Sequence, residues 1–248
     1  MTALIFTSVS KQFKARSILS SVSIQIAAGS VVGLIGDNGA GKTTLLRLAA
    51  GVMRPTTGTV RAFGQDPYRD RRKTGRRIGA ILEKPGHYDE CSVRRTLTFW
   101  YGFYGDDGAT SAAVDSALDL HGLRDVANEP VGQLSLGYRH RVALARAVHP
   151  AAELVLLDEP FDGLDPRART DFKGVLRTNG ASKRTVVFSS HNLGDVEELC
   201  DYVLLLQDGC VERLDNVNAL RARATVDKHA SLDEVYANVS ANRHGLTA

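Results

Sequence analysis

The pattern GxxxxGK[ST] between Gly36 and Thr43 constrains the fold of this chain more than any other feature. It follows directly after the apolar run Val31–Ile35, and a helical pattern follows at Thr43–Ala50. A buried strand, a glycine-rich loop and a helix in this order form a phosphate site, because the loop amides and the helix N-terminus point at negative charge. We therefore expect a parallel-sheet protein that binds a nucleotide.

Apolar runs of strand length recur later in the chain and alternate with helical stretches. They are Leu154–Leu157, Thr185–Ser189 and Tyr202–Leu206, and Asp208-Gly209 predicts a tight turn into a last strand at Cys210–Leu214. Strands that are separated by helices form a mainly parallel sheet with helices on its faces. The predicted class is therefore α/β.

The N-terminal segment predicts a second, different β part. Leu4–Val9 has the composition of a strand, and Val22, Ile24 and Ile26 alternate with polar residues, as in a strand with one buried face. We expect an antiparallel β subdomain here.

The middle of the chain shows no strand pattern from about residue 85 to 150. Helices are expected instead at Thr96–Tyr104, Ala112–His121 and Tyr138–Val148. We interpret this stretch as a helical insertion into the nucleotide core. The predicted organisation is one domain over residues 1–215, with its core at 1–84 and 151–215, a helical subdomain at 85–150 and a short extension at 216–248.

Composition excludes several classes of function. The longest apolar runs are of strand length, far below the roughly 20 residues of a membrane-spanning helix, and the N-terminus does not have a secretory pattern. The net charge of +3 is too small to indicate a nucleic-acid partner. Three cysteines without a CxxC pair fit a reducing cytosol.

One local charge excess stands out, with six basic residues within nine positions: Arg69, Arg71, Arg72, Lys73, Arg76 and Arg77. It is either a solvated surface or a contact for anionic lipid headgroups or an acidic partner.

A second motif says how the nucleotide is used. LSLGYRHRVALARAV at 134–148 precedes LVLLDEP at 154–160, so that Ser135 lies 23 residues before Asp158 (158 minus 135). With the phosphate loop, this order resembles the ATP-binding cassette (ABC) ATPases over nearly the whole chain. The resemblance implies a P-loop NTPase core with ATP and Mg²⁺ as ligands.

The resemblance also assigns roles to individual residues. Glu159 is the expected catalytic carboxylate that polarises the attacking water, and His191, which could otherwise be structural, is expected to contact the γ-phosphate. Mg²⁺ is expected at Thr43, Asp158 and Glu83. The expected ATP-binding residues are Phe13, Gly36, Asn38, Gly39, Ala40, Gly41, Lys42, Thr43, Thr44, Ser135, Gly137 and Asp165. Phe13 either stacks on adenine or is a core aromatic of the first hairpin.

Ser135 and Gly137 are expected to contact ATP held by a second copy of the chain, which predicts an ATP-dependent head-to-tail homodimer. Two residues depart from the family pattern: the motif reads LSLGY, with Leu136 and Tyr138, and Glu83 stands where a glutamine is usual. Both variations resemble those in ATPases of bacterial drug and bacteriocin exporters, as does the segment Ser231–Tyr236.

These features predict an ATPase subunit at the cytoplasmic face of the cell membrane that drives a separate permease, with export favoured over import. The aromatic stretch Phe99–Tyr104 is expected either to line the groove for that permease or to form an ordinary helix core. Two alternatives remain open. One is a soluble ABC ATPase that serves an assembly scaffold such as iron–sulfur biogenesis, and the other is a nucleotide-gated interaction module with little turnover. The transported substrate is not encoded in these motifs.

Overall fold

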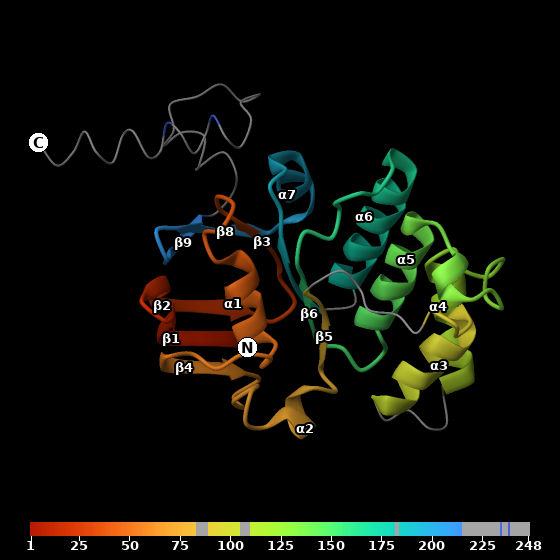
Figure 1. Ribbon diagram of the computed structural model, residues 1–248, viewed down its shortest axis with the longest axis horizontal. Helices are drawn as coiled ribbons and strands as arrows, with labels where there is room; N and C mark the ends of the chain where they lie inside the picture. Colours follow the sequence, from red (N-terminus) through yellow and green to blue (C-terminus); the bar gives the residue numbers. More distant parts are fainter. Residues whose placement is uncertain (83–88, 105–109, 182–183, 215–233, 235–237, 239–248) are drawn as a thin grey trace, which may run out of the picture.

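The computed structural model describes residues 1–82, 89–104, 110–181, 184–214, 234 and 238 of the 248-residue chain. Within this part, strands form two sheets, and helices cover both faces of the larger one (Figure 1). None of the helices in these ranges combines the length and apolar character that a bilayer span requires.

The larger sheet has six strands in the order β5-β6-β7-β3-β8-β9. Their bounds are β3 Val31–Ile35, β5 Ile78–Ile81, β6 Leu154–Leu157, β7 Thr185–Ser189, β8 Tyr202–Gln207 and β9 Cys210–Leu214. All neighbours pair in parallel except β8 and β9, which form a hairpin. Every residue of β3, β6, β7 and β8 is buried, as expected for parallel strands that are covered on both faces.

The smaller sheet is antiparallel and has the order β2-β1-β4, with β1 at Thr2–Phe13, β2 at Arg16–Ala27 and β4 at Thr57–Ala62. Its strands alternate between buried and exposed residues, because one face packs on the core and the other meets solvent. The amide of Ser20 donates to the carbonyl of Gly209 at 2.8 Å, which joins this sheet to the β8–β9 turn.

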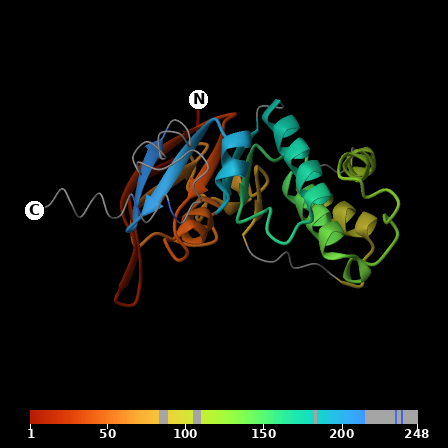
Figure 2. The ribbon, with the colours of Figure 1, turned by 90° about the horizontal axis from the view of Figure 1, so that it is seen from above.

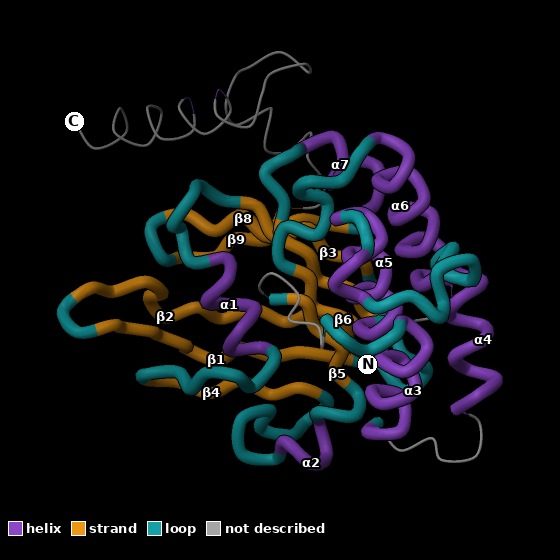
Figure 3. Tube along the Cα trace, turned by 45° about the vertical axis from the view of Figure 1, so that its right-hand side comes forward, coloured by secondary structure: helices purple, strands orange, loops and turns teal. Residues whose placement is uncertain are grey.

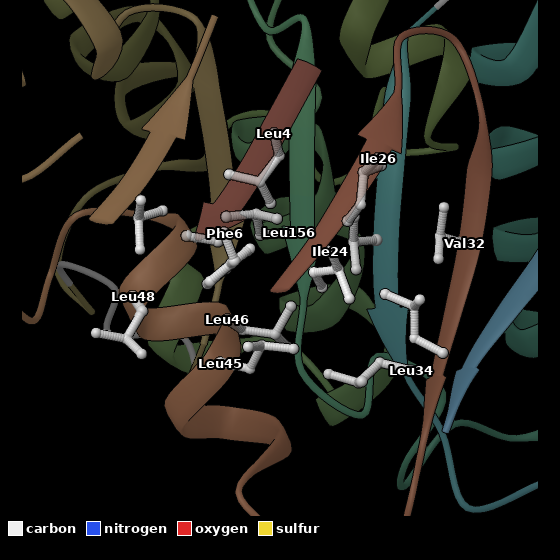
Figure 4. Packing of buried hydrophobic residues seen from close by; sticks show 14 of the residues in the cluster. Leu4, Phe6, Ile24, Ile26, Val32, Leu34, Leu45, Leu46, Leu48 and Leu156 are labelled. Carbon is white, nitrogen blue, oxygen red and sulfur yellow. The ribbon is translucent and has the colours of Figure 1, made fainter. Parts of the chain in front are cut away.

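Helix α1 (Lys42–Ala49) lies between the two sheets. Its residues Leu45, Leu46 and Leu48 pack against Leu4 and Phe6 of β1, Ile24 and Ile26 of β2, and Val32, Leu34 and Leu156 of the larger sheet (Figure 4). The opposite face of the larger sheet is covered by α5 (Leu136–Ala147), α6 (Pro166–Ala181) and α7 (Leu193–Leu199). The phosphate loop is thus carried by a helix that is buried against both sheets.

Helices α3 (Val93–Phe103), α4 (Thr110–Leu120) and α5 pack on one another around a separate apolar cluster, which includes Leu97, Leu118 and Val142. The Tyr101 hydroxyl donates to the carbonyl of Ala145 at 2.8 Å and fixes α3 on α5. Seen from above, the β-rich part occupies one side of the molecule and helices α3–α6 the other (Figure 2). The division into a nucleotide core at 1–84 and 151–215 and a helical subdomain at 85–150 stays a prediction.

The predicted α/β class with an antiparallel N-terminal part is confirmed. The three expected helices of the middle segment are present, and each begins two or three residues earlier than predicted. Two strands, β4 and β5, and helices α2 (Arg71–Thr74), α6 and α7 were not expected. The short extension predicted at 216–248 falls outside the described residues apart from positions 234 and 238.

Candidate functional site

The glycine loop between β3 and α1 curls around the ammonium group of Lys42. The Lys42 Nζ donates to the carbonyl of Gly36 at 2.6 Å and to that of Asp37 at 3.3 Å. Gly41 has a φ of 108°, a conformation that side chains disfavour, and a Cβ at Gly36 would lie 2.4 Å from the carbonyl oxygen of Leu206. Both glycines are therefore required for the loop to close around the lysine.

Asp158, directly after β6, links the start of α1 to the end of β7. The Thr43 hydroxyl donates to Asp158 Oδ2 at 2.5 Å, and the Ser189 hydroxyl donates to Oδ1 at 2.7 Å. Ser189 Oγ also accepts the backbone N–H of Glu159 at 2.7 Å. A single hydroxyl at the end of β7 thus positions both acidic residues.

Glu159 is held in a strained backbone conformation, with a φ of 44°. A non-glycine residue in the left-handed region is uncommon, and such residues cluster at functional sites. Its Oε1 lies 3.7 Å from Lys42 Nζ, and its Oε2 lies 3.0 Å from Nδ1 of His191. The carboxylate therefore bridges the phosphate-loop lysine and the histidine that follows β7.

Asp162 adds a second negative charge beside His191, with Oδ1 at 3.7 Å from Nδ1. The ligand atoms of Glu159, Asp162 and His191 all lie within 4.8 Å of one another.

A cavity of about 1090 Å³ opens beside the glycine loop. It brings together most of the expected nucleotide residues: Phe13, Asn38, Gly39, Gly41, Lys42, Thr43, Thr44, Asp158 and Glu159. Gly36, Ala40 and His191 do not line it. The carbonyl of Gly36 accepts from Lys42, and His191 contacts Glu159, so both lie next to residues that do line the cavity. The volume lies at the upper end of the usual range for small-molecule sites.

Phe13 is not a core aromatic. Its side chain is 45% exposed at the end of β1, and the Lys11 ammonium lies 5.0 Å from the ring centroid. The ring is accessible from the cavity, so stacking on a base is sterically possible.

Ser135 and Gly137 do not line this cavity, whereas Leu136 between them does. Ser135 is the N-cap of α5 and accepts the N–H of Tyr138 at 3.4 Å. Leu136 is 50% exposed, and its Cδ2 lies beside Gly163. The two residues expected to contact ATP of a second copy are thus at the start of a helix and outside the lining of the chain's own cavity.

Asp165 does not line the cavity either and caps α6. Its Oδ1 accepts the backbone N–H groups of Arg167 and Ala168, each at 2.9 Å. Glu83 falls outside the described residues, so its expected metal role stays a prediction.

Sequence reasoning missed several residues of the site. Ser189 and Asp162 were not singled out, and neither were Arg139 and His140 on α5, which line the cavity. Burial and then the charge of Arg139 lower the pKa of His140 below its usual value. The signal for Ser189 was its place as the last residue of a strand that ends next to Asp158.

Comparisons with known proteins agree with this geometry. The family model described as ABC transporter matches residues 19–162. The bacitracin transport ATP-binding protein BcrA of Bacillus licheniformis is 32% identical over 204 residues, which cover 82% of this chain and 66% of BcrA. The ABC transporter ATP-binding protein NatA of Bacillus subtilis is 34% identical over 190 residues, 76% of this chain and 77% of NatA.

The Nod factor export ATP-binding protein I of Burkholderia lata is 32% identical over 205 residues, 82% of this chain and 67% of that protein. Among solved structures, an ATP-binding subunit of an ABC transporter is 27% identical and superposes with a TM-score of 0.85, covering 96% of this chain and 99% of that one.

Proposed function

The chain belongs to the ABC transporter family as an ATP-binding ATPase subunit, and from this premise we propose that two copies of it close on two ATP molecules and drive a separate membrane subunit in export. The observation that carries the proposal is the continuous contact from Lys42 through Glu159 to His191 beside the glycine loop. This contact supports the proposal, because a nucleotide bound on this loop would bring its terminal phosphate close to a cation, a carboxylate and an imidazole.

The residues around Asp158 fit a Mg²⁺ ion. Thr43 and Asp158 come from different elements and converge to 2.5 Å, and both offer the oxygen ligands that this hard cation prefers. We propose that they hold Mg²⁺ together with Glu83. When bound, Mg²⁺ would neutralise phosphate charge. Ser189 keeps the Asp158 carboxylate turned toward Thr43.

Glu159 has the chemistry to orient the attacking water and to accept its proton. A carboxylate suffices for this task in phosphoryl transfer, because most of the charge stabilisation comes from positioned cations and amides. Lys42 and the loop amides supply that charge on one side. His191, through its contact with Glu159, reports whether the terminal phosphate is present.

The dimer is proposed from the placement of Ser135 and Gly137. Both lie at the N-terminal end of α5, where the helix dipole favours an anion, and Ser135 is exposed to solvent. Since they do not line the chain's own cavity, a second copy's nucleotide is their natural ligand. Asp165, which starts α6 beside Gly137, is proposed to join that contact.

The membrane subunit is proposed to dock on α3. Phe99 and Phe103 are 55% and 65% exposed, and both rings contact Trp100 edge to face. Only part of the aromatic stretch is available, because Tyr101 is buried and Tyr104 stacks on His149 with ring centroids 3.6 Å apart. Export is favoured because BcrA-like and Nod factor relatives are named for transport and export.

Two experiments test this function. The purified chain should release phosphate from ATP in the presence of Mg²⁺, and Glu159→Gln should lower the rate of release by about 10²–10⁴-fold while ATP still binds. Purification from gently solubilised cells should recover a multi-span membrane protein in stoichiometric amount. Recovery of a soluble partner alone, from cells where the chain hydrolyses ATP, would favour the assembly-scaffold alternative.

A further inference from the structure

The basic run found in the sequence lies on a surface formed by two separate segments. This α2 surface consists of the exposed cations of helix α2 and its flanks, together with one from the turn after α1: Arg54, Arg69, Arg71, Arg72, Lys73 and Arg76. Arg77, the remaining member of the run, does not belong to it, since its guanidinium pairs with Glu153 in a two-point contact at 2.5 and 2.8 Å.

The nearby carboxylates do little to neutralise this surface. Asp66 accepts the N–H groups of Tyr68 and Arg69 at 2.9 and 3.0 Å, and its ion pair with the Arg69 side chain is at 3.7 Å. Asp70 accepts the N–H of Asp66. Within the described ranges, the structure gives Arg72, Lys73 and Arg76 no carboxylate partner. Six cations therefore face two carboxylates that are tied to the backbone.

Two of the cations are held in place by one aromatic ring. The guanidinium carbons of Arg54 and Arg71 lie 4.2 and 4.6 Å from the ring centroid of Tyr68. Arg71 also donates from Nη2 to the carbonyl of Gly51 at 3.1 Å. Cation–π contacts of this kind limit the motion of both side chains, so two of the six positive charges are held in place.

An apolar side chain accompanies the charge. Val52 is 59% exposed in the same turn as Arg54. In two views, α2 lies at the same lower edge of the molecule as α3, the helix with the exposed Phe99 and Phe103 (Figure 1 and Figure 3). The α2 surface thus lies in the same part of the molecule as the helix that we propose meets the membrane subunit.

We propose that the α2 surface binds the anionic headgroups of the bilayer that surrounds the membrane subunit, an inference that rests on the proposed function. Long cationic side chains from two segments, with an exposed valine among them, can contact the phosphates of mobile lipid headgroups at a bilayer surface. Contact with lipid positions the chain at the membrane before or while the permease is bound.

The test is vesicle co-sedimentation of the full chain with vesicles of phosphatidylcholine alone or containing 30 mol% phosphatidylglycerol. Binding should require the anionic lipid and weaken as salt increases. The triple variant Arg72→Gln, Lys73→Gln and Arg76→Gln should partition about a hundredfold less, because each cation near an anionic bilayer contributes about fivefold.

The matched control is Lys14→Gln, Arg61→Gln and Arg213→Gln, which removes the same charge from exposed positions on the strands or their turns. It should bind like the wild type. Equal loss in both triple variants, or equal binding to both kinds of vesicle, would overturn the proposal. So would loss of the co-purified membrane protein in the α2 variant without any change in vesicle binding, since this outcome assigns the surface to an acidic protein partner. ATP hydrolysis is measured in each preparation, so failure of the proposed function appears separately.

Discussion

Nδ1 of His191 lies 3.0 Å from Oε2 of Glu159, although the two residues follow different strands of the sheet. The contact exists because β6 and β7 are parallel neighbours, so that their carboxyl ends meet at one edge. Any signal that moves the loop after β7 therefore reaches the proposed catalytic carboxylate directly.

Glu159→Gln should lower ATP turnover by about 10²–10⁴-fold, the usual contribution of a positioned general base. The amide keeps the size of the side chain but cannot accept the proton of water, so ATP still binds and the closed dimer accumulates. Gel filtration with saturating ATP checks this. A variant that stays monomeric under those conditions would contradict the head-to-tail dimer.

His191→Ala should lower turnover and leave ATP affinity in place.

Lys42→Ala should weaken ATP binding by roughly 10- to 100-fold, because a hydrogen bond to a charged group contributes about 1.5–3 kcal/mol. Its ammonium contacts the carbonyls of Gly36 and Asp37, in the loop on which the phosphate would bind. Titration with a fluorescent ATP analogue measures the affinity. Lys14→Ala, at an exposed position in the β1–β2 turn, is the control and should bind as the wild type does.

Ser189→Ala should reduce turnover by about tenfold, or about 1.4 kcal/mol, and raise the Mg²⁺ concentration needed for half-maximal rate. The hydroxyl links Asp158 to the backbone of Glu159, and no other described group replaces it. Ser190→Ala removes a similarly buried hydroxyl whose hydrogen bonds, among the described residues, go to the backbone of Asn192, and it should leave the Mg²⁺ dependence unchanged. A similar shift in both variants would mean that Ser189 acts only through stability.

Acid should destabilise the chain through His149. This residue is fully buried at the end of α5, neither ring nitrogen has a hydrogen-bond partner among the described residues, and burial followed by the charge of Arg184 lowers its pKa to about 4. The unfolded chain gains a proton near pH 6.5, whereas the folded chain does not until about pH 4. The free energy of unfolding therefore falls as pH drops through that window, by up to about 1.4 kcal/mol per pH unit.

Urea titrations at pH 7, 6 and 5 measure this slope. His149→Phe keeps the stack on Tyr104 and should show a smaller loss of stability between pH 6 and 5. Part of the loss will remain, because burial also lowers the pKa of His121 to about 3. An unchanged slope in the variant would show that His149 ionises normally.

Asp195→Asn should cost about 3 kcal/mol of unfolding free energy, since it leaves charges without their buried partner. Asp195 is 2% exposed and binds Arg169 at 2.5 Å and Lys173 at 2.9 Å, which joins α7 to α6. The control is Asp171→Asn, which breaks an exposed pair with Arg141 and should cost less than about 1 kcal/mol. Equal costs in the two variants would contradict the buried role of Asp195.

The phosphate loop, the strands of the central sheet other than β5, and the acidic pair were predictable because each rests on local pattern: glycines at fixed spacing, or runs of apolar residues next to them. The strand at Thr57–Ala62 was not, since only two of its six residues are buried and Gly58 weakens its pattern. Helix α6 was missed because its polar sequence carries only a short apolar stripe.

Within the site, sequence reasoning found the ionisable residues and missed Ser189, because a serine at the end of a strand is common and its partners come from 31 and 30 positions away. It also could not show that Asp165 caps a helix while Ser135 caps another. These properties depend on where the ends of strands and helices meet, and hence on the packing of elements that are distant in sequence.

The left-handed backbone at Glu159 affects how the thermal stability of this chain can be raised. Glycine or asparagine tolerates that conformation better than glutamate does, so either one at this position would relieve about 1 kcal/mol or more of strain. A search for heat-resistant variants that ignores turnover should therefore select against the very carboxylate that the reaction needs. We expect the Glu159→Asn variant to melt at a higher temperature than the wild type and to lose turnover, so that catalysis and thermal stability oppose each other at this one position.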